Sequence, residues 1–477
     1  MRNHSGNWAP AYAGVTKLAG VTMALVLAGC AAPPPIDASL LPATPPSFKE
    51  DAPRFKVVTA QPQPDWWRAF ADATLDDLVA RAERSNATIQ VAAARLAQSR
   101  ALLLQARAQQ LPDVGLSAGA QRADGLGTAA RPPGLPQTLY TFGANASYEA
   151  DLFGRLALAT KAASLDAAAS EALLRNARLV IQADVAQAYL QLRAIDEERQ
   201  LVRGTVEAYR GTLDLTQRRY RAGDVSELDV ARAGAQVAST ESDALALDRT
   251  RATLEHAIAV LVGETASTFS IAQRPWSSAL PSIPAGVPAT VLARRPDVQA
   301  AQATLAAAQS RVGVAKAAWL PDIALTASGG VASSEISELF RYSARSWGIG
   351  ALLSLPIFDG GRRQAAIDVR SGQMDEAIAQ YRQQVLVALQ DVEDELAALR
   401  LLAEQAEAQQ RAVTAAARAT TLSGIRYRDG IVSQLDLLDA QRSELANRRQ
   451  ALQVRSAQYQ ATVGLIRALG GGWETRS

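Results

Sequence analysis

The chain has 477 residues, and 48% of them are hydrophobic while only 5% are aromatic, because much of the apolar content is alanine. This composition favours long, closely packed helices over a bulky globular core. Its 49 Lys and Arg residues nearly balance 47 Asp and Glu residues, so charge gives no reason to expect a nucleic acid partner.

The first 29 residues have the pattern of a secretory leader. Arg2 and Lys17 precede an apolar run, residues 18–28, that is too short to span a bilayer as a helix. The run ends in Leu27-Ala28-Gly29-Cys30, which resembles the bacterial lipobox. Cys30 is the only cysteine, and its position suits acylation better than redox chemistry. We expect residues 1–29 to be a signal peptide and Cys30 to carry a covalent lipid; the alternative is a chance cysteine in an uncleaved leader.

Residues 30–64 are rich in proline and have no period, which predicts an extended tether between the lipid and the first folded element. Helical patterning starts after Asp65 and continues to about Gln110. Four later stretches alternate between apolar and small or polar residues, two in each half of the chain: 114–121, 139–153, 321–332 and 347–358. About ten residues with one apolar and one polar face are what a tilted membrane-spanning strand requires.

Two very long helices are predicted, over residues 156–222 and 362–429. At 1.5 Å per residue each would be on the order of 100 Å long, far beyond the usual globular helix. Apolar residues recur at seven-residue steps along the second run and along the helix that returns from it, which predicts supercoiled helices packed side by side. In the first run Arg199 interrupts this step.

The same helix-turn-helix is written twice, 207 positions apart. Arg219 begins RYRAGDVSELDV and Arg426 begins RYRDGIVSQLDL, and eight of these twelve positions match. Each copy has a glycine suited to a left-handed helix end and a Ser with an Asp three residues later, the pattern of a capping box. This internal duplication divides the folded chain into a first repeat, 65–270, a proline-rich linker, 271–288, and a second repeat, 289–477.

Four amphipathic strands are too few to close a barrel, since about eight is the smallest workable number. Open strand edges are not tolerated in lipid. Several chains must therefore contribute strands to one barrel, and the residues alone leave two and three chains equally open.

Catalysis finds little support in the sequence. The only histidines are His4, in the leader, and His256, alone on a helix. Without a further His or Cys, His-Cys metal sites and imidazole triads are excluded, and no glycine-rich phosphate loop follows a strand. We expect no enzyme activity, no catalytic residue, no metal and no cofactor other than the lipid on Cys30.

Motifs along nearly the whole mature chain resemble the outer membrane factor (TolC-like) family, and within it the efflux lipoproteins of the OprM/NodT type. These motifs are the lipobox, Asp65-Trp66-Trp67, Arg294-Arg295-Pro296-Asp297, Leu355-Pro356-Ile357-Phe358, the RYR.G tips and Leu469-Gly470-Gly471-Gly472-Trp473. The resemblance implies an α+β membrane protein: a homotrimeric twelve-stranded β-barrel, four strands per chain, continued by a long α-helical coiled-coil barrel with a mixed equatorial domain.

The resemblance also implies a function, that of a passive exit duct in the outer membrane of a Gram-negative bacterium. Such a duct is lipid-anchored, extends into the periplasm, and conducts small molecules such as drugs. Its partners would be outer membrane lipid, a periplasmic adaptor (membrane fusion protein) and an inner-membrane RND or ABC pump. Two alternatives remain: an exit duct for type I secretion or metal efflux, and, in another class, a non-conducting periplasmic coiled-coil scaffold.

Family kin close the periplasmic tips with rings of Leu and Asp at positions that match Leu435, Asp436 and Asp439. The resemblance implies that Leu435 plugs the resting pore and that Asp439 forms a selectivity ring. A helix cap is the plainer interpretation of Asp436. Val432 stands where some kin have a gate-latching Arg, so that latch is not carried over.

Six further residues form the tip turns and, by resemblance, contact the adaptor: Arg219, Tyr220, Gly223, Arg426, Tyr427 and Gly430. Core packing explains the two tyrosines equally well, because both lie on the apolar heptad step. The two glycines need only be turn residues.

Overall fold

The computed structural model describes residues 34–40, 42–50, 65–123, 137–281, 283 and 288–471. The predicted signal peptide and Cys30 lie outside these residues. Contacts divide the chain into two compact units. Unit 1 comprises Met1–Leu41, Ala97–Ala169 and Ala301–Tyr381, and unit 2 comprises Pro42–Leu96, Ser170–Ala300 and Arg382–Ser477. The units cut across the two sequence repeats, whose boundaries stay a prediction.

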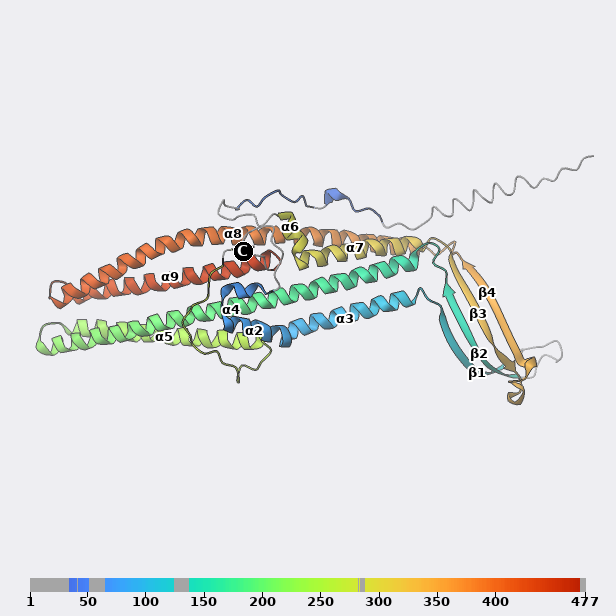
Figure 1. Ribbon diagram of the computed structural model, residues 1–477, viewed down its shortest axis with the longest axis horizontal. Helices are drawn as coiled ribbons and strands as arrows, with labels where there is room; N and C mark the ends of the chain where they lie inside the picture. The colour runs from blue at the N-terminus through green and yellow to red at the C-terminus, as the bar shows by residue number, and fades with distance from the viewer. Residues whose placement is uncertain are drawn as a thin grey trace, which may run out of the picture. The chain divides into compact units, whose positions relative to one another are not determined.

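Helices make up most of the described chain, and Figure 1 shows two antiparallel hairpins, α4 with α5 and α8 with α9. The α-helices are α2 (Ala73–Ser85), α3 (Ala87–Ala108), α4 (Arg155–Ala222), α5 (Glu227–Leu261), α6 (Pro288–Arg294), α7 (Pro296–Ala317), α8 (Arg362–Arg428) and α9 (Gln434–Ala468). Short 3-10 helices are η1 (Ala38–Leu40), η2 (Trp66–Phe70), η3 (Ile336–Glu338) and η4 (Tyr342–Ala344). Among the described helices, none combines the length and the apolar content needed to cross a membrane.

Unit 1 contains one antiparallel sheet whose strands follow one another in the order β1-β2-β3-β4 (Figure 1). The strands are β1 (Asp113–Ala123), β2 (Gln137–Glu149), β3 (Asp322–Ser333) and β4 (Arg345–Ser354). All four predicted strands are confirmed, but β2 and β4 end before the predicted residues Phe153 and Phe358. Beyond β4, Pro356 has no N–H to donate to a ladder, and beyond β2 the chain turns into α4 through Gly154 at φ 79°.

The strand register gives the sheet two unlike faces. One row across the four strands is Val114, Ala146, Ala327 and Ile349, and the next row, on the opposite face, is Gly115, Asn145, Ser328 and Gly348. The same contrast repeats one step along, with Leu116, Ala144, Gly329 and Trp347 followed by Ser117, Gly143, Gly330 and Ser346. One face is therefore apolar and the other small and polar, as the alternation predicted.

The described part of the predicted tether packs on folded elements. In unit 1, Ile36 packs against a buried cluster of α7 and α8 that contains Leu305 and Ile378. In unit 2, Phe48 is buried in the main hydrophobic core. The next two backbone N–H groups donate to the two carboxylate oxygens of Glu393, at 2.7 and 3.0 Å.

The heptad interruption at Arg199 has a structural cause in unit 2. Arg199 is buried on α4 and donates to Asp248 of α5 at 2.6 Å and to Asp196 at 3.2 Å. Asp196 also accepts from Arg193 and Arg251. A buried charge is costly unless it is paired. At the position of Arg199, ion pairs and hydrogen bonds to Asp196 and Asp248 therefore take the place of an apolar heptad contact.

Candidate functional site

The two hairpin tips, both in unit 2, are turns of the predicted kind. Gly223 and Gly430 have φ of 85° and 75°, the left-handed conformation that favours glycine. At each tip the residue after the glycine donates its N–H back to the helix. Asp224 reaches the carbonyl of Arg219 at 2.9 Å, and Ile431 reaches that of Arg426 at 2.8 Å. The repeated glycines therefore end α4 and α8 in the same way.

The acidic residue of each capping box is engaged in its cap. Asp229 accepts from the backbone N–H of Ser226 at 3.1 Å, and Asp436 accepts from that of Ser433 at 3.0 Å. The hydroxyl of Ser433 also donates to Asp436 at 2.6 Å. These hydrogen bonds lower the pKa of Asp436 below its ordinary value. Asp436 thus completes the capping box at the start of α9, which is the plainer interpretation of this residue.

Leu435 and Asp439 point away from the core of the chain. Leu435 is 42% exposed, whereas its neighbours Leu437 and Leu438 are buried. The side chain of Asp439 is 64% exposed, and its closest cation is Arg442, at 3.7 Å. Residues four apart share one face of a helix. Leu435 and Asp439 therefore form one outward-facing pair at the start of α9.

Arg219 links the first tip to the second. Its guanidinium lies 4.7 Å from the centroid of the Tyr427 ring, and it donates to the carbonyls of Tyr427 at 3.3 Å and Arg428 at 3.2 Å. Those carbonyls belong to the last turn of α8, where a cation is favoured. The side chain of Arg426, which holds the same place in the second repeat, makes no hydrogen bond or ion pair with the described residues.

The two tip tyrosines consequently differ. Tyr427 is 3% exposed beneath Arg219, whereas Tyr220 is 45% exposed. Sequence reasoning grouped them because both precede a tip glycine and both continue the heptad step. Sequence reasoning missed the contact of Arg219 with the second tip. The RYR motif occurs in both copies, and nothing in it indicates which of the two first arginines contacts the opposite tip.

Some buried polar atoms at the second tip have no partner among the described residues. They are the hydroxyl of Tyr427 and both amide atoms of Gln434. A buried polar group left unpaired costs about 1–3 kcal/mol. The tip arrangement of a single chain is therefore not fully satisfied, which lowers the cost of rearranging it.

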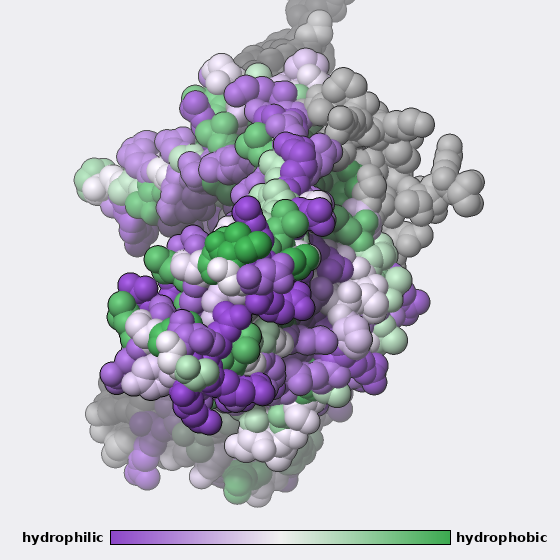
Figure 2. Space-filling model, turned by 90° about the vertical axis from the view of Figure 1, so that its left-hand side faces the viewer, coloured by the Kyte–Doolittle hydropathy of each residue, from purple (hydrophilic) through white to green (hydrophobic). Residues whose placement is uncertain are grey.

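Figure 2 faces the hairpin tips of unit 2 and shows mostly hydrophilic residues with hydrophobic patches among them. Exposed large apolar residues of the tips include Tyr220, Leu228, Ile425, Ile431 and Leu435. An apolar side chain on such a surface is available to another chain.

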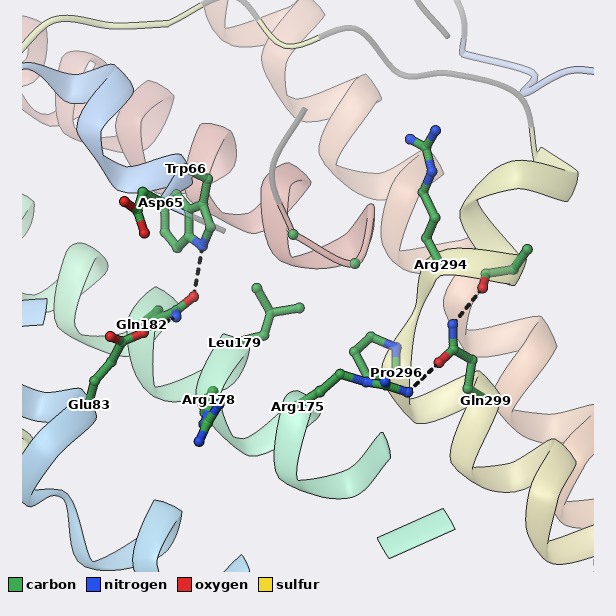
Figure 3. Close-up of a pocket in the computed structure, with 13 residues that line it drawn as sticks. Asp65, Trp66, Glu83, Arg175, Arg178, Leu179, Gln182, Arg294, Pro296 and Gln299 are labelled. Carbon is green, nitrogen blue, oxygen red and sulfur yellow. Dashed lines mark hydrogen bonds between the residues drawn. The ribbon is translucent and has the colours of Figure 1, made fainter. Parts of the chain in front are cut away.

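A cavity of about 610 Å³ in unit 2 is lined by Asp65, by residues of η2, α2, α4, α6 and α7, and by Gly470 and Gly471. Figure 3 shows Gln182 accepting from the indole of Trp66 at 3.0 Å and donating to Glu83, while Arg175 donates to Gln299 at 2.7 Å. Its lining contains no His, Cys, Ser, Thr, Tyr or Lys. The cavity therefore offers no hydroxyl, thiol, amine or imidazole nucleophile, and one of its two carboxylates, Glu83, is bonded to Gln182.

His256 is exposed on α5, and His4 lies outside the described residues. Within the described ranges, no group of three or more His, Cys, Asp or Glu residues could hold a metal ion.

Comparison with known proteins supplies the family. The sequence profile described as outer membrane efflux protein matches residues 78–264 and 287–471. The chain is 34% identical over 417 residues to the pyoverdine export outer membrane protein OpmQ of Pseudomonas aeruginosa, covering 86% of this chain and 88% of OpmQ. It is 29% identical over 462 residues to the cation efflux system protein CusC of Escherichia coli, covering 96% of this chain and 99% of CusC.

Solved structures agree. The outer-membrane channel OprN has a TM-score of 0.87 and 30% identity, covering 93% of this chain and 100% of that one. The outer membrane protein VceC of Vibrio cholerae has a TM-score of 0.82 and 30% identity, covering 87% of this chain and 100% of VceC.

These likenesses confirm the fold class predicted from the sequence, that of the trimeric outer membrane efflux channels, with four strands and long helices in each chain. The matched relatives are channels and not enzymes. The two matched segments together cover most of the described chain. The chain therefore belongs to the outer membrane efflux protein family.

Proposed function

We propose that three copies of this chain form the exit duct of a tripartite efflux system, receiving small molecules from a periplasmic adaptor and an inner-membrane RND or ABC pump. The observation that carries this proposal is the two-faced sheet, which ends in unpaired edges at β1 and β4. In lipid such edges must be paired, so a ring of copies pairs β4 of one with β1 of the next. The apolar face then meets lipid and the polar face lines water.

The polar face is uncharged in its middle rows, while Asp113, Glu149 and Asp322 lie toward one end of it. Its central rows carry Gly, Ser, Asn and Thr: Gly115, Ser117 and Gly119 of β1, Thr141, Gly143 and Asn145 of β2, Thr326, Ser328 and Gly330 of β3, and Ser346, Gly348 and Gly350 of β4. Related proteins are named for the export of pyoverdine, toluene and cations. A neutral wet surface suits cargo this varied, and we propose small molecules such as drugs for this chain.

Gating belongs to the hairpin tips in this proposal. Leu435 is exposed on one chain and meets its copies on the axis, where it excludes water from the resting pore. Asp439, one turn further along the same face, forms a ring of three carboxylates that attracts cations. Arg219 holds the first tip against the second while the pore is closed. The adaptor contacts the same tips, at Tyr220, Gly223, Arg426 and Gly430.

The chain is held in the outer membrane at two points, the barrel and the lipid on Cys30. Cys30 lies outside the described residues. The docked segment from Pro34 onwards supports a short connection between that lipid and the folded chain.

Single-channel recording of tip variants tests the gate. We expect Leu435→Ala to raise the open fraction, and Asp439→Ala to reduce cation preference without changing the open fraction. Leu228→Ala is the matched control, because Leu228 is exposed at the equivalent place of the first tip. Unchanged conductance and selectivity for both second-tip variants would refute this gate.

Efflux itself is tested in cells. Deleting the gene should raise the accumulation of exported compounds, and panels of antibiotics, solvents, siderophores and metals identify the cargo. The wild-type gene should restore export. Unchanged accumulation across all panels, in a strain that lacks redundant exit ducts, would contradict the proposed function.

A further inference from the structure

The cavity of about 610 Å³ in unit 2 carries positive charge that its own carboxylates do not balance. Three arginines line it: Arg175, Arg178 and Arg294. Its two acids already have partners, because Asp65 lies 3.2 Å from Arg68 and Glu83 accepts from Gln182 at 2.6 Å. The three guanidiniums of the lining are therefore not neutralised by the carboxylates beside them.

Two of these arginines have no partner among the residues that the structure describes. The side chain of Arg178 is exposed and that of Arg294 is half-buried, and neither makes a hydrogen bond or an ion pair there. The next residue along the chain shows the contrast. Arg295 is buried and paired with Asp297 at 2.7 Å and with Asp391 at 2.9 Å. Arg295 thus serves the fold, whereas Arg178 and Arg294 are available to a ligand.

Arg175 is held in place by a neutral partner. It donates to the amide oxygen of Gln299 at 2.7 Å, and the amide nitrogen of Gln299 donates to the carbonyl of Ala293 at 2.7 Å (Figure 3). A guanidinium has five N–H donors, and Arg175 spends one of them on Gln299. Its position is therefore fixed while its charge stays uncompensated, which is the preorganisation that an anion site requires.

The remaining wall of the cavity is apolar and equally fixed. Trp66 is 3% exposed and donates its indole N–H to Gln182, which is held in turn by Glu83. Leu179 and Pro296 add apolar surface beside the arginines. A volume of about 610 Å³ is within the range of sites for small organic molecules. The lining thus combines guanidiniums for an anionic group with an apolar wall for the body that carries it.

We propose that this cavity binds a small phosphate monoester with an apolar body. Arginine presents a planar fork that matches the oxygens of a phosphate group. The two unpaired guanidiniums match the charge of about −2 that a monoester carries near neutral pH. A ligand in the cavity contacts elements far apart in the sequence, from η2 to the segment after α9.

This site is separate from the gate, and the proposal goes beyond the proposed function. Arg178 is 44 residues before Ala222, the last residue of α4. At 1.5 Å per residue this is about 66 Å along the helix. All the lining residues belong to one unit of one chain, so binding does not require export to occur.

Calorimetric titration of the full-length trimer in dodecyl maltoside and a phosphate-free buffer tests the site. The probe is phenyl phosphate, and phenol and inorganic phosphate represent its apolar and anionic parts. We expect phenyl phosphate to bind once per chain. Its Kd should be at least about tenfold lower than that of inorganic phosphate, because burial of the ring adds to the affinity. Phenol should give no measurable heat of binding.

Arginine variants test which side chains hold the phosphate. Arg178→Gln with Arg294→Gln should raise the Kd for phenyl phosphate at least about a hundredfold, since each charged hydrogen bond contributes about tenfold or more. The thermal midpoint without ligand should not change, because neither side chain has a partner to lose. Arg411→Gln with Arg418→Gln removes two exposed arginines of α8 and is the matched control, with an unchanged Kd. Arg175→Lys keeps the charge but loses the fork, and should weaken binding about tenfold.

Four results would overturn the proposal. They are no binding of phenyl phosphate to the folded wild-type trimer, equal Kd values for the two double variants, binding of dihexanoyl phosphatidic acid but not of phenyl phosphate, and binding only in Glu474→Gln. The third result would assign the site to a lipid headgroup. The fourth would assign it to the chain's own carboxylate, since Glu474 is three residues beyond Gly471 and lies outside the described residues.

The same wild-type sample is recorded in a planar bilayer. A trimer that conducts but binds no phenyl phosphate overturns this proposal only, whereas a trimer that binds it but never conducts overturns the proposed function.

Discussion

Gly330 is the residue at which the sheet is packed most closely against its own backbone. A Cβ added there would lie 2.6 Å from the Cα of Gly143 on the neighbouring strand, so the backbone of β2 itself would have to move. The adjacent Gly329, on the apolar face, has no atom within 4 Å of an added Cβ. Gly330 and Gly329 therefore form a matched pair for substitution by alanine, one crowded and one not.

We predict that Gly330→Ala destabilises the protein by about 1–3 kcal/mol, the usual cost of overpacking, and that Gly329→Ala is neutral or slightly stabilising. Thermal midpoints of the detergent-solubilised trimer, taken at one scan rate, check this. Equal midpoints for the two variants would contradict the close approach of β2 and β3 at Gly330.

Glu395 on α8 makes the free energy of unfolding depend on pH. Burial raises its pKa to about 7, Asp391 and Asp394 act in the same direction, and Arg467 opposes them. The folded state then binds more protons than the unfolded state between about pH 4.5 and 7. Stability therefore falls as pH rises through that window and is flat above it.

We expect Glu395→Gln to remove this pH dependence, which amounts to at most about 3 kcal/mol per chain. Unfolding midpoints measured from pH 5 to 8 check it. Glu404→Gln, which changes an exposed glutamate of the same helix, should keep the wild-type slope. A slope that survives in Glu395→Gln would assign the pH dependence to other groups.

Sequence reasoning at the residue scale succeeded where a role depends on local geometry. Ser433, Asp436 and Gly430 were predictable because caps and turns are made by neighbouring residues. The crossing of Arg219 to Tyr427 was not predictable, because two equal copies of one motif become unequal only through tertiary packing.

At the scale of elements, Arg219 joins the two hairpins at their tips through the carbonyls of Tyr427 and Arg428. We predict that Arg219→Ala raises the open fraction of the channel about ten- to 150-fold, corresponding to the roughly 1.5–3 kcal/mol of hydrogen bonds made by a charged group. Single-channel open times give the measurement.

Arg426→Ala is the control for that prediction, since it removes the same side chain at the same place in the other repeat without removing a contact. If Arg219→Ala and Arg426→Ala raise the open fraction equally, the general loss of positive charge at the tips is the cause. The contact of Arg219 with the second tip is then not the cause.

The elements themselves were largely predictable. Alternation with a period of two identified the four strands, and seven-residue steps identified the paired helices. The end of β4 was placed too late because apolar residues continue through Phe358 past the strand. The docking of the segment around Phe48 was missed, because a proline-rich stretch without a period gives no sign of which surface it meets.

For the whole molecule, the sequence predicted that one chain is incomplete, since four strands cannot close. The number of copies could not be derived from one chain, and the resemblance supplied it. The compact units could not be predicted either. They follow contacts between helices far apart in sequence, whereas the repeats follow the order of the chain.

The central claim is that copies of this chain together enclose a water-filled path that is gated at the hairpin tips. A non-conducting scaffold would have no use for a sheet with one apolar and one polar face.

Single-channel recording of the purified wild-type protein in a planar bilayer, under a potassium chloride gradient, tests this claim most directly. We predict discrete conductance steps with a reversal potential that favours cations, as the exposed Asp439 requires. A protein that inserts as a trimer and passes no current at any voltage, both as wild type and as Leu435→Ala, would contradict the account.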